Sequence, residues 1–400
     1  CMSRARRRRS SSTNSSAFGR PREAAPLNAA RIWAWALYDF ANTIFSMNVI
    51  TRYFGLWVTE DRGGTDTHVA LAMAVAPALT LIGMPLFGLV SDRYRRRMPF
   101  LIFSTLLSVA ATVVLGMTDR LSVGLAAFVL AYFGFQVGIV FYDALLPEVA
   151  GTPGRIGHVS GYGVALGYLG AVAGLFLVAP FVSAGGHGAA FIPTAALFLL
   201  FSLPIMLFVR DRESVPIAWR RLPGEVAQAA RRLANTVRSL RELPGVGWFL
   251  LANFLYSDAV NTVINFMAIY AARVVNFSGP RMDRFLVMST LVAVAASFGW
   301  GALTDRLGPR RVMTMVLATW CAGLGLAAAA PSAGVFWLVG PLVGAGLGGI
   351  WVAGRTLLIQ LVPADRLGEF LGLYGLTEKS AAVLGPLVWA LIVDHLFAGW

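Results

Sequence analysis

The sequence predicts an all-α membrane protein made of two copies of a six-helix unit. Three observations lead to this fold class: a strongly apolar composition, eleven apolar segments long enough to cross a bilayer, and short motifs that recur at a nearly constant spacing. The 400 residues are 57% hydrophobic and 13% charged, with a mean hydropathy of +0.68. Soluble domains carry about 25% charged residues, so this composition argues against an ordinary cytosolic enzyme.

Eleven segments of the chain are apolar enough for a transmembrane helix, which needs about 20 mostly apolar residues. They are 33–58, 69–91, 99–117, 122–146, 159–182, 189–209, 246–272, 285–303, 312–330, 334–361 and 370–393. Two six-helix units require twelve helices, so we expect the twelfth to follow Trp400 in a longer chain.

Paired motifs in the two halves of the chain predict an internal duplication. The pairs are Gly88-x-x-x-Asp92-Arg93 with Gly301-x-x-x-Asp305-Arg306, Asp39-x-x-Asn42-Thr43 with Asp258-x-x-Asn261-Thr262, and Asp143 with Arg355. Their offsets are 213, 219 and 212 residues. One such pair could arise by chance, but several at nearly one offset indicate a repeated unit.

Arginine is distributed unevenly between alternate connections. With the N-terminal tail in the cytoplasm, the connections on its side carry 25 of the 33 Lys and Arg residues, and those on the other side carry four. Cytoplasmic loops of membrane proteins are enriched in these residues, so we predict a cytoplasmic N-terminus. Topology then explains the net charge of +13, and we expect no nucleic-acid partner.

The same reading divides the chain into four parts. We expect a disordered Arg/Ser-rich cytoplasmic tail at 1–32, a six-helix bundle at 33–209, a cytoplasmic linker at 210–244 and a second bundle at 245–400, with five helices present. In the linker, Val226, Ala230 and Leu233 recur at helical spacing among arginines. This pattern predicts an amphipathic helix at the membrane surface.

The duplicated Gly-x-x-x-Asp-Arg loop resembles that of the major facilitator superfamily, although Arg95 stands in the first copy where glycine is common. Three further stretches resemble the autophagy-related vacuolar-effluxer-like permeases: Trp35-Ala-Leu-Tyr-Asp-Phe-Ala-Asn42, Phe141-Tyr-Asp-Ala-Leu-Leu-Pro-Glu148 and Glu369-Phe-Leu-Gly-Leu-Tyr374. The resemblance covers most of 33–396. It implies a twelve-helix permease of two pseudo-symmetric bundles, with amino-acid efflux from the vacuole as the fungal activity.

Short loops fit a bacterial member of this family, so we expect a multi-pass protein of the bacterial inner membrane, acting as a monomer in the lipid bilayer. No Gly-x-x-x-x-Gly-Lys-Ser/Thr motif is present, which argues against ATP as the energy source. Four histidines and two cysteines, Cys1 and Cys321, provide no metal-ligand spacing. We therefore predict no enzyme, no cofactor and no bound metal.

Polar side chains form stripes on four of the predicted helices. Ionisable groups within a bilayer are costly and usually functional, and helices one, four, seven and ten line the central path in the superfamily. The candidate substrate- and proton-binding residues are Asp39, Asn42, Gln136, Asp143, Asp258, Asn261, Asn265, Arg355 and Lys379. For the asparagines, hydrogen bonding between helices is an equally good explanation.

These side chains suit a zwitterionic solute. The aspartates can bind an ammonium group or exchange a proton, and Arg355 offers a planar fork for a carboxylate. We therefore predict a proton-coupled secondary transporter of a small, amino-acid-like substrate that works by alternating access. Sodium coupling stays open, because carboxylate and amide oxygens also bind Na⁺.

The resemblance to the superfamily also implies a cytoplasmic gate. Its candidate residues are Asp92, Arg93, Arg96, Asp305, Arg306 and Arg310. Positive-inside topology alone could explain several of the arginines, but it does not explain the two aspartates.

Two other functions remain open at this point. A proton-linked exporter of drugs or other hydrophobic metabolites would use the same carboxylates, although Arg355 and Lys379 favour an anionic group on the cargo. A membrane receptor or scaffold that transports nothing is an alternative of another class.

Overall fold

The computed structural model describes residues 29–94, 96–211, 240, 243–275, 280–329 and 332–396. Most of the predicted tail and the predicted amphipathic helix of the linker lie outside the described residues. The side chains of Asp92, Arg93 and Asn265 also lie outside them.

The described chain is helical, and its eleven long helical runs confirm the eleven predicted segments. The first run consists of α1 (Ala29–Phe45), η1 (Ser46–Tyr53), α2 (Phe54–Leu56) and η2 (Trp57–Asp61). The others are α3 (Asp66–Tyr94), α4 (Met98–Met117), α5 (Leu121–Ala150), α6 (Ile156–Gly185), α7 (Phe191–Phe208), α9 (Pro244–Val275), α10 (Pro280–Leu307), α11 (Pro309–Ala329), α12 with α13 (Ala333–Phe336, Val339–Leu361) and α14 (Leu367–Leu396). Within the described part of the chain, seven helices are long and apolar enough to cross a membrane by length and composition.

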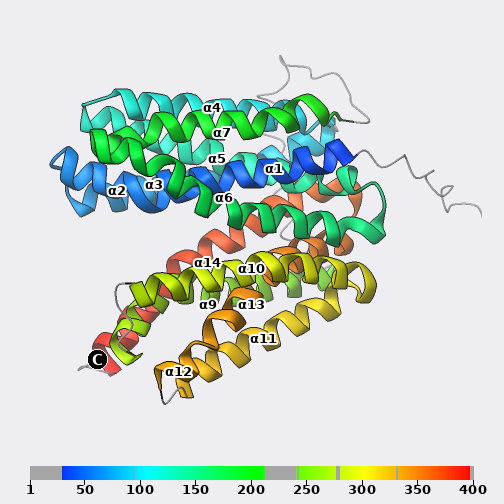
Figure 1. Cartoon of the computed structure of the whole chain (residues 1–400). Coiled ribbons are helices and arrows are strands. Elements are labelled where there is room, and N and C mark those ends of the chain that lie inside the picture. The colour runs from blue at the N-terminus through cyan, green and yellow to red at the C-terminus, as the bar shows by residue number, and fades with distance from the viewer. Residues whose placement is uncertain are drawn as a thin grey trace, which may run out of the picture.

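The helices form two bundles, α1–α7 and α9–α14 (Figure 1). In the first, α1 packs against α6 and α7, and α4 packs against α5 and α7. In the second, α13 packs against α10 and α11, and α14 packs against α9. The bundles meet where α6 packs against α10 and where α3 packs against α14. The fifth run of each bundle therefore contacts the second run of the other, as a pseudo-twofold axis requires.

Local hydrogen bonds repeat along with the motifs. Thr43 Oγ1 donates to the carbonyl oxygen of Asp39 at 2.9 Å, and Thr262 Oγ1 donates to that of Asp258 at the same distance. Both are bonds across one helical turn, and they occur at equivalent places in α1 and α9. The duplication seen in the sequence is thus also a duplication of side-chain conformation.

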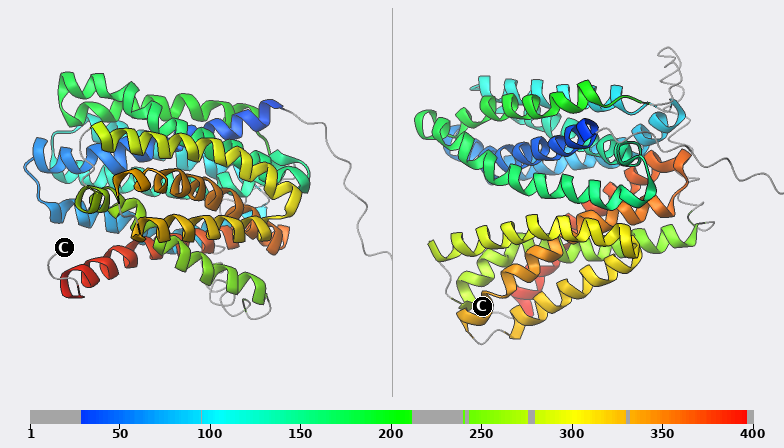
Figure 2. Two further views of the ribbon diagram at one scale, coloured as in Figure 1. Left: turned by 60° about the horizontal axis from the view of Figure 1, so that its bottom comes forward. Right: turned by 45° about the vertical axis from the view of Figure 1, so that its right-hand side comes forward.

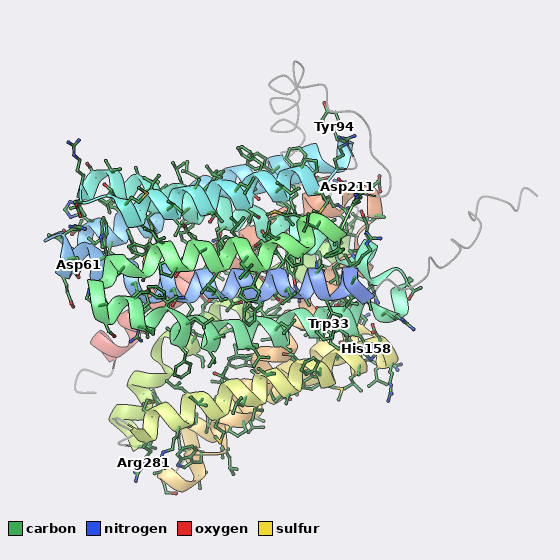
Figure 3. All side chains as sticks on the ribbon, turned by 45° about the horizontal axis from the view of Figure 1, so that its top comes forward. Trp33, Asp61, Tyr94, His158, Asp211 and Arg281 are labelled. Carbon is green, nitrogen blue, oxygen red and sulfur yellow. The ribbon has the colours of Figure 1, made fainter. Side chains whose placement is uncertain are left out.

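The two ends of the bundle differ in charge, and we call one the arginine-rich end and the other the opposite end. The arginine-rich end carries the connections at 96–97, 151–155 and 308, and the opposite end carries those at 62–65, 118–120 and 186. Figure 3 places Tyr94, His158 and Asp211 at the arginine-rich end, and Asp61 and Arg281 at the other.

The bundles lie close together at the arginine-rich end and diverge toward the opposite end (Figures 1 and 2). Burial along α6 follows this arrangement: Val159 and Ser160 are fully buried, whereas Phe176 and Phe181, further along the helix, are exposed. In α10, Ser297 and Thr304 are buried and Leu291 is exposed. Exposed apolar side chains on helices of this length suit a lipid environment.

Candidate functional site

Arg355 of α13 forms an ion pair with the other bundle, inside the membrane-spanning part of the protein. Its Nη1 donates to Asp143 Oδ1 of α5 at 3.0 Å, and its Nη2 lies 4.0 Å from Asp39 Oδ2 of α1. Ser160 of α6 accepts two further bonds, from Nε to its Oγ at 2.6 Å and from Nη2 to its carbonyl oxygen at 2.9 Å. The guanidinium thus bridges three helices of the first bundle.

The position of this pair follows from the internal repeat. Asp143 and Arg355 are equivalent positions, 212 residues apart, and here they contact each other. Two equivalent residues can meet only near the axis that relates the two halves. Arg355 precedes the end of α13 by six residues, which at 1.5 Å per residue is about 9 Å. The pair therefore lies on the axis, toward the arginine-rich end.

Burial makes this pair energetically important. The side chain of Arg355 is 8% exposed and that of Asp143 is 14% exposed. A buried charge that loses its partner destabilises a protein by about 3–5 kcal/mol, because its lost hydration is no longer compensated. The pair thus ties the two bundles together through groups that cannot be separated cheaply unless another ion replaces one of them.

Two aromatic rings cover the guanidinium. The Cζ atom of Arg355 lies 5.1 Å from the ring centre of Trp35 and 5.8 Å from that of Tyr142. The two rings stack at 4.2 Å, and Trp35 Nε1 donates to the carbonyl oxygen of Tyr142 at 3.0 Å. A Cβ atom at Gly163 would lie 2.6 Å from Tyr142 Oη and 2.7 Å from the Trp35 ring, so only glycine leaves room for both rings.

The three sequence stretches that resemble the effluxer-like permeases meet around this point. The first supplies Trp35 and Asp39, and the second supplies Tyr142 and Asp143. The third ends at Tyr374, whose hydroxyl oxygen lies 2.8 Å from where a Cβ of Gly354 would be. Stretches more than 200 residues apart in sequence therefore surround the Gly354–Arg355 segment of α13.

Of the predicted binding residues, the structure brings together Asp39, Asp143 and Arg355. Asn42 and Gln136 are buried, and both polar atoms of each lack a hydrogen-bond partner among the described residues. Asn261 Nδ2 donates to the carbonyl oxygen of Ser257 at 2.8 Å within its own helix. Asp258 is partly buried, with an unpartnered Oδ1, and Lys379 is partly buried.

At the arginine-rich end, Asp305 of α10 binds the first turn of α6. Its Oδ1 accepts from the backbone N–H of Gly157 at 2.7 Å, and its Oδ2 accepts from that of His158 at 2.8 Å. The ring Nδ1 of His158 contacts the same Oδ2. A carboxylate at a helix N-terminus is stabilised by unpaired backbone N–H groups and by the helix dipole. Asp305 thus holds the two bundles together at this end.

The helices can approach this closely because glycines face each other. A Cβ at Gly157 would lie 2.6 Å from the carbonyl oxygen of Gly301, and one at Gly161 would lie 2.5 Å from that of Ser297. These distances are shorter than any ordinary carbon–oxygen contact. The small-residue face of α6 therefore serves the contact with α10.

The predicted gate arginines differ from Asp305 in the contacts that their side chains make. Arg306 and Arg310 are exposed, and within the described part of the chain their side chains make no hydrogen bond or ion pair. Arg96 is partly buried beside Arg97, which donates from Nη1 to Glu148 Oε1 at 2.9 Å. In this conformation the closing contact at α10 therefore comes from Asp305 and from backbone groups of α6.

Replacing Asp305 by alanine should weaken the closed arginine-rich end. Two charge-assisted hydrogen bonds to backbone N–H groups would be lost, each contributing about 1.5–3 kcal/mol. We expect faster reaction of a cysteine introduced at Thr304, which is 2% exposed at the contact with Gly157, with a water-soluble maleimide in a protein whose native cysteines are replaced by alanine. Asp365→Ala is the matched control, because Asp365 is exposed at the same end. Equal labelling rates in both variants would contradict the role of Asp305.

Sequence reasoning missed several residues around Arg355. Trp35 and Tyr142 belong to the stretches that resemble the effluxer-like permeases but are not among the candidate binding residues, and neither is Ser160. Periodicity does not identify them, because their function depends on which helix faces them. Glu378, next to Lys379, is also absent from the candidate binding residues, although an acidic residue within an apolar helix is itself a signal.

Comparisons with known proteins identify the family to which the chain belongs. Residues 63–396 match the family described as "Vacuole effluxer Atg22 like". The chain is 28% identical over 380 residues to an uncharacterized MFS-type transporter, YxiO, of Bacillus subtilis, covering 90% of this chain and 87% of that protein. It is 26% identical over 268 residues to Autophagy-related protein 22-1 of Emericella nidulans, covering 60% of this chain and 45% of the fungal protein.

Among solved structures, the chain is similar to a bacterial homologue of the iron transporter ferroportin in an outward-facing state. The TM-score is 0.70 at 16% identity, covering 91% of each chain. This similarity shows the major facilitator fold. Since the relatives and structural neighbours are transporters and not enzymes, the chain is a multi-pass membrane transporter of that superfamily. Within it, this protein belongs to the vacuole effluxer Atg22-like family.

Proposed function

We propose that this protein is a proton-coupled secondary transporter that moves a small, amino-acid-like zwitterion across the bacterial inner membrane by alternating access. The arginine-rich end faces the cytoplasm in this proposal. The observation that carries it is the ion pair of Arg355 with Asp143 on the axis between the bundles. In alternating access, such a contact must form and break once in every cycle.

With this orientation the described conformation is closed toward the cytoplasm. Asp305 and the glycines of α6 join the bundles on that side, and the bundles diverge on the other. Asn42 on α1 and Gln136 on α5 are buried, and along their helices both lie nearer the open side than Asp39 and Asp143. Their unpartnered amide atoms are suited to hydrogen-bond a polar solute.

A zwitterion can replace the ion pair that joins the bundles. The substrate carboxylate would take the place of Asp143 on Arg355, and its ammonium group would be held by Asp143 and Asp39. The charges stay compensated throughout, which avoids the penalty for a lone buried ion. An uncharged solute offers no such exchange, and this is the physical support for an amino-acid-like cargo.

Reconstituted protein in liposomes tests the proposal. Liposomes are loaded with a mixture of labelled amino acids, a pH gradient is imposed, and the released compounds are measured. We expect release of a subset that depends on the gradient and falls at least tenfold in Arg355→Ala and Asp39→Asn. Equal export by these variants would refute the role of the charged cluster.

The same assay separates the other functions. Flux confined to hydrophobic compounds would favour a drug or metabolite exporter, and no flux across a broad panel would favour a receptor or scaffold. Release driven by a sodium gradient at constant pH would show that the coupled ion is Na⁺ and not a proton.

The orientation makes a prediction of its own. With both native cysteines replaced by alanine, a cysteine at Gly154 should be protected from a membrane-impermeant maleimide in intact cells, and one at Ala184 should react. Both positions are exposed, the first at the arginine-rich end and the second at the opposite end. The reverse pattern would place the arginine-rich end outside the cell.

A further inference from the structure

A second cluster of buried polar groups lies next to the Arg355 ion pair, beside Gly354 of α13. The hydroxyl oxygens of Tyr374 and Tyr256 lie 2.8 and 3.1 Å from the same point, the ideal Cβ position of Gly354, so they are less than 6 Å apart. Glu378 lies one helical turn beyond Tyr374 on α14, which places both side chains on one face. Both tyrosine hydroxyls and Glu378 Oε1 are buried, and within the described part of the chain the groups that Tyr374 can interact with are Tyr256 and Glu378 themselves.

Glu378 also differs from Asp143 and Asp39 in its distance from basic side chains. Asp143 and Asp39 share Arg355, at 3.0 and 4.0 Å. Among the described residues Glu378 has no basic group within 4.0 Å, and Lys379, the next residue, points about 100° away around the helix. Its carboxylate therefore forms no ion pair within 4.0 Å among the described residues, and the charge of Lys379 acts on it only from a longer distance.

The internal repeat indicates which side of α14 carries the side chain of Lys379. Lys379 is equivalent to Gly167, at an offset of 212 residues, and a Cβ at Gly167 would lie 3.4 Å from the Asp39 carboxyl carbon. Asp39 is itself equivalent to Asp258, and α14 packs on α9 as α6 packs on α1. By this equivalence Lys379 lies on the side of α14 that faces α9, and among the described residues it forms an ion pair within 4.0 Å with neither Asp258 nor Glu378.

The buried ionisable groups within the helices also include more acids than cations. The buried or partly buried set described within the helices has four carboxylates, Asp39, Asp143, Asp258 and Glu378, and two cations, Arg355 and Lys379, and so carries a net charge of −2 when fully ionised; Arg52 is exposed, and the side chain of Arg273 lies outside the described residues. Proton relays in membrane proteins are built from such acids. Uptake of one proton would bring this interior nearer to neutrality before any substrate binds.

We propose that Glu378 is the site that takes up and releases the coupled proton, and that Tyr374 and Tyr256 form its pocket. The proton arrives from water on the open side, converts the carboxylate to a carboxylic acid, and leaves to water on the other side. This inference rests on the proposed coupled transport. The groups that face Glu378 are Tyr374 and Lys379 on its own helix, Tyr256 on α9, Asp143 on α5 and Arg355 on α13.

Coupling to the substrate site would pass through α13. Gly354 contacts the tyrosines, and the next residue, Arg355, holds the ion pair with the first bundle. A change in how Tyr374 and Tyr256 pack when Glu378 gains a proton would therefore act directly on the helix that carries Arg355. Two neighbouring residues of one helix connect the proton site and the substrate site.

The test is infrared spectroscopy of the full chain in lipid during a pH titration, without substrate. A carboxylic-acid C=O band should appear on acidification, be lost in Glu378→Gln, and persist in Asp258→Asn and Asp143→Asn. Glu369→Gln is the matched control on the same helix, because Glu369 is buried but held by Arg366 at 3.0 Å. A band that survives in Glu378→Gln, or that disappears in Asp258→Asn, would overturn the assignment.

A second pair of variants covers the case in which Glu378→Gln does not fold. Tyr374→Phe and Tyr256→Phe should move the midpoint of the band by on the order of one pH unit, because a neighbouring hydroxyl interacts differently with the two forms of the acid. An unchanged midpoint in both would also refute the pocket. The band needs no substrate, so its presence without any flux would reject the proposed transport and leave the proton site standing.

Discussion

Replacing Arg355 by alanine should destabilise the described conformation by about 3–5 kcal/mol, since Asp143 and Asp39 would be left as buried carboxylates without a cation. In detergent or lipid, the cooperative unfolding transition of the variant should occur at a lower temperature than that of the wild type. Arg310→Ala is the control, because Arg310 is exposed and surface substitutions usually change stability by less than about 0.5 kcal/mol.

A charge exchange separates the ion pair from the packing of Arg355. The two residues occupy equivalent positions near the pseudo-twofold axis, so Asp143→Arg combined with Arg355→Asp should recover part of the lost stability. Recovery should be incomplete, because Ser160 and the Trp35 and Tyr142 rings contact the guanidinium only from the first bundle. A double variant no more stable than the worse single one would show that the pair contributes nothing across the interface.

The second large effect is expected at Gly161. A methyl group there would lie 2.5 Å from the backbone oxygen of Ser297, which cannot move without α10. Such overpacking costs about 1–3 kcal/mol and should shift the balance between the two transport conformations about 5- to 150-fold toward the one open at the arginine-rich end. The bundles would separate at that end in Gly161→Ala.

Spin labels can measure this separation. With Cys1 and Cys321 replaced by alanine, labels at Gly154 and Leu307 report the distance between α6 and α10 at the arginine-rich end, where both positions are exposed. Gly161→Ala should add a longer distance. Gly299→Ala, on α10 with nothing within 4 Å of the new methyl group, should leave the distribution unchanged. If both variants showed only the same short distance, α6 would have shifted locally to accommodate the methyl group without separation of the two bundles.

Much of the fold could be predicted from the sequence because the signals are local. A run of about 20 apolar residues must form a helix across the bilayer, since no water is present there to satisfy the backbone. All eleven helical runs were found in this way. The boundaries were less accurate: α5 continues to Ala150, past Pro147, and the first run changes from α-helix to π-helix at Ser46. Periodicity does not detect such changes.

The candidate site was only partly predictable. The stripes on the helices identified Asp39, Asp143 and Arg355 as buried charges, and the repeat paired Asp143 with Arg355 as equivalent positions. It did not follow that the two side chains touch each other, because a stripe defines one face of a helix and not what that face meets. Ser160, Tyr374 and Glu378 acquire their roles from helices more than a hundred residues away.

The sequence by itself determined the number of helices, their duplication and the family to which the chain belongs. Each of these depends on composition and short motifs along one stretch of chain. The tertiary structure decided which charges are paired: Arg355 with Asp143, Asp305 with the first turn of α6, and Glu378 with no ion pair within 4.0 Å among the described residues. The physical reason is that the energy of a buried charge is set by groups within a few ångströms, and only the packing of helices brings those groups together.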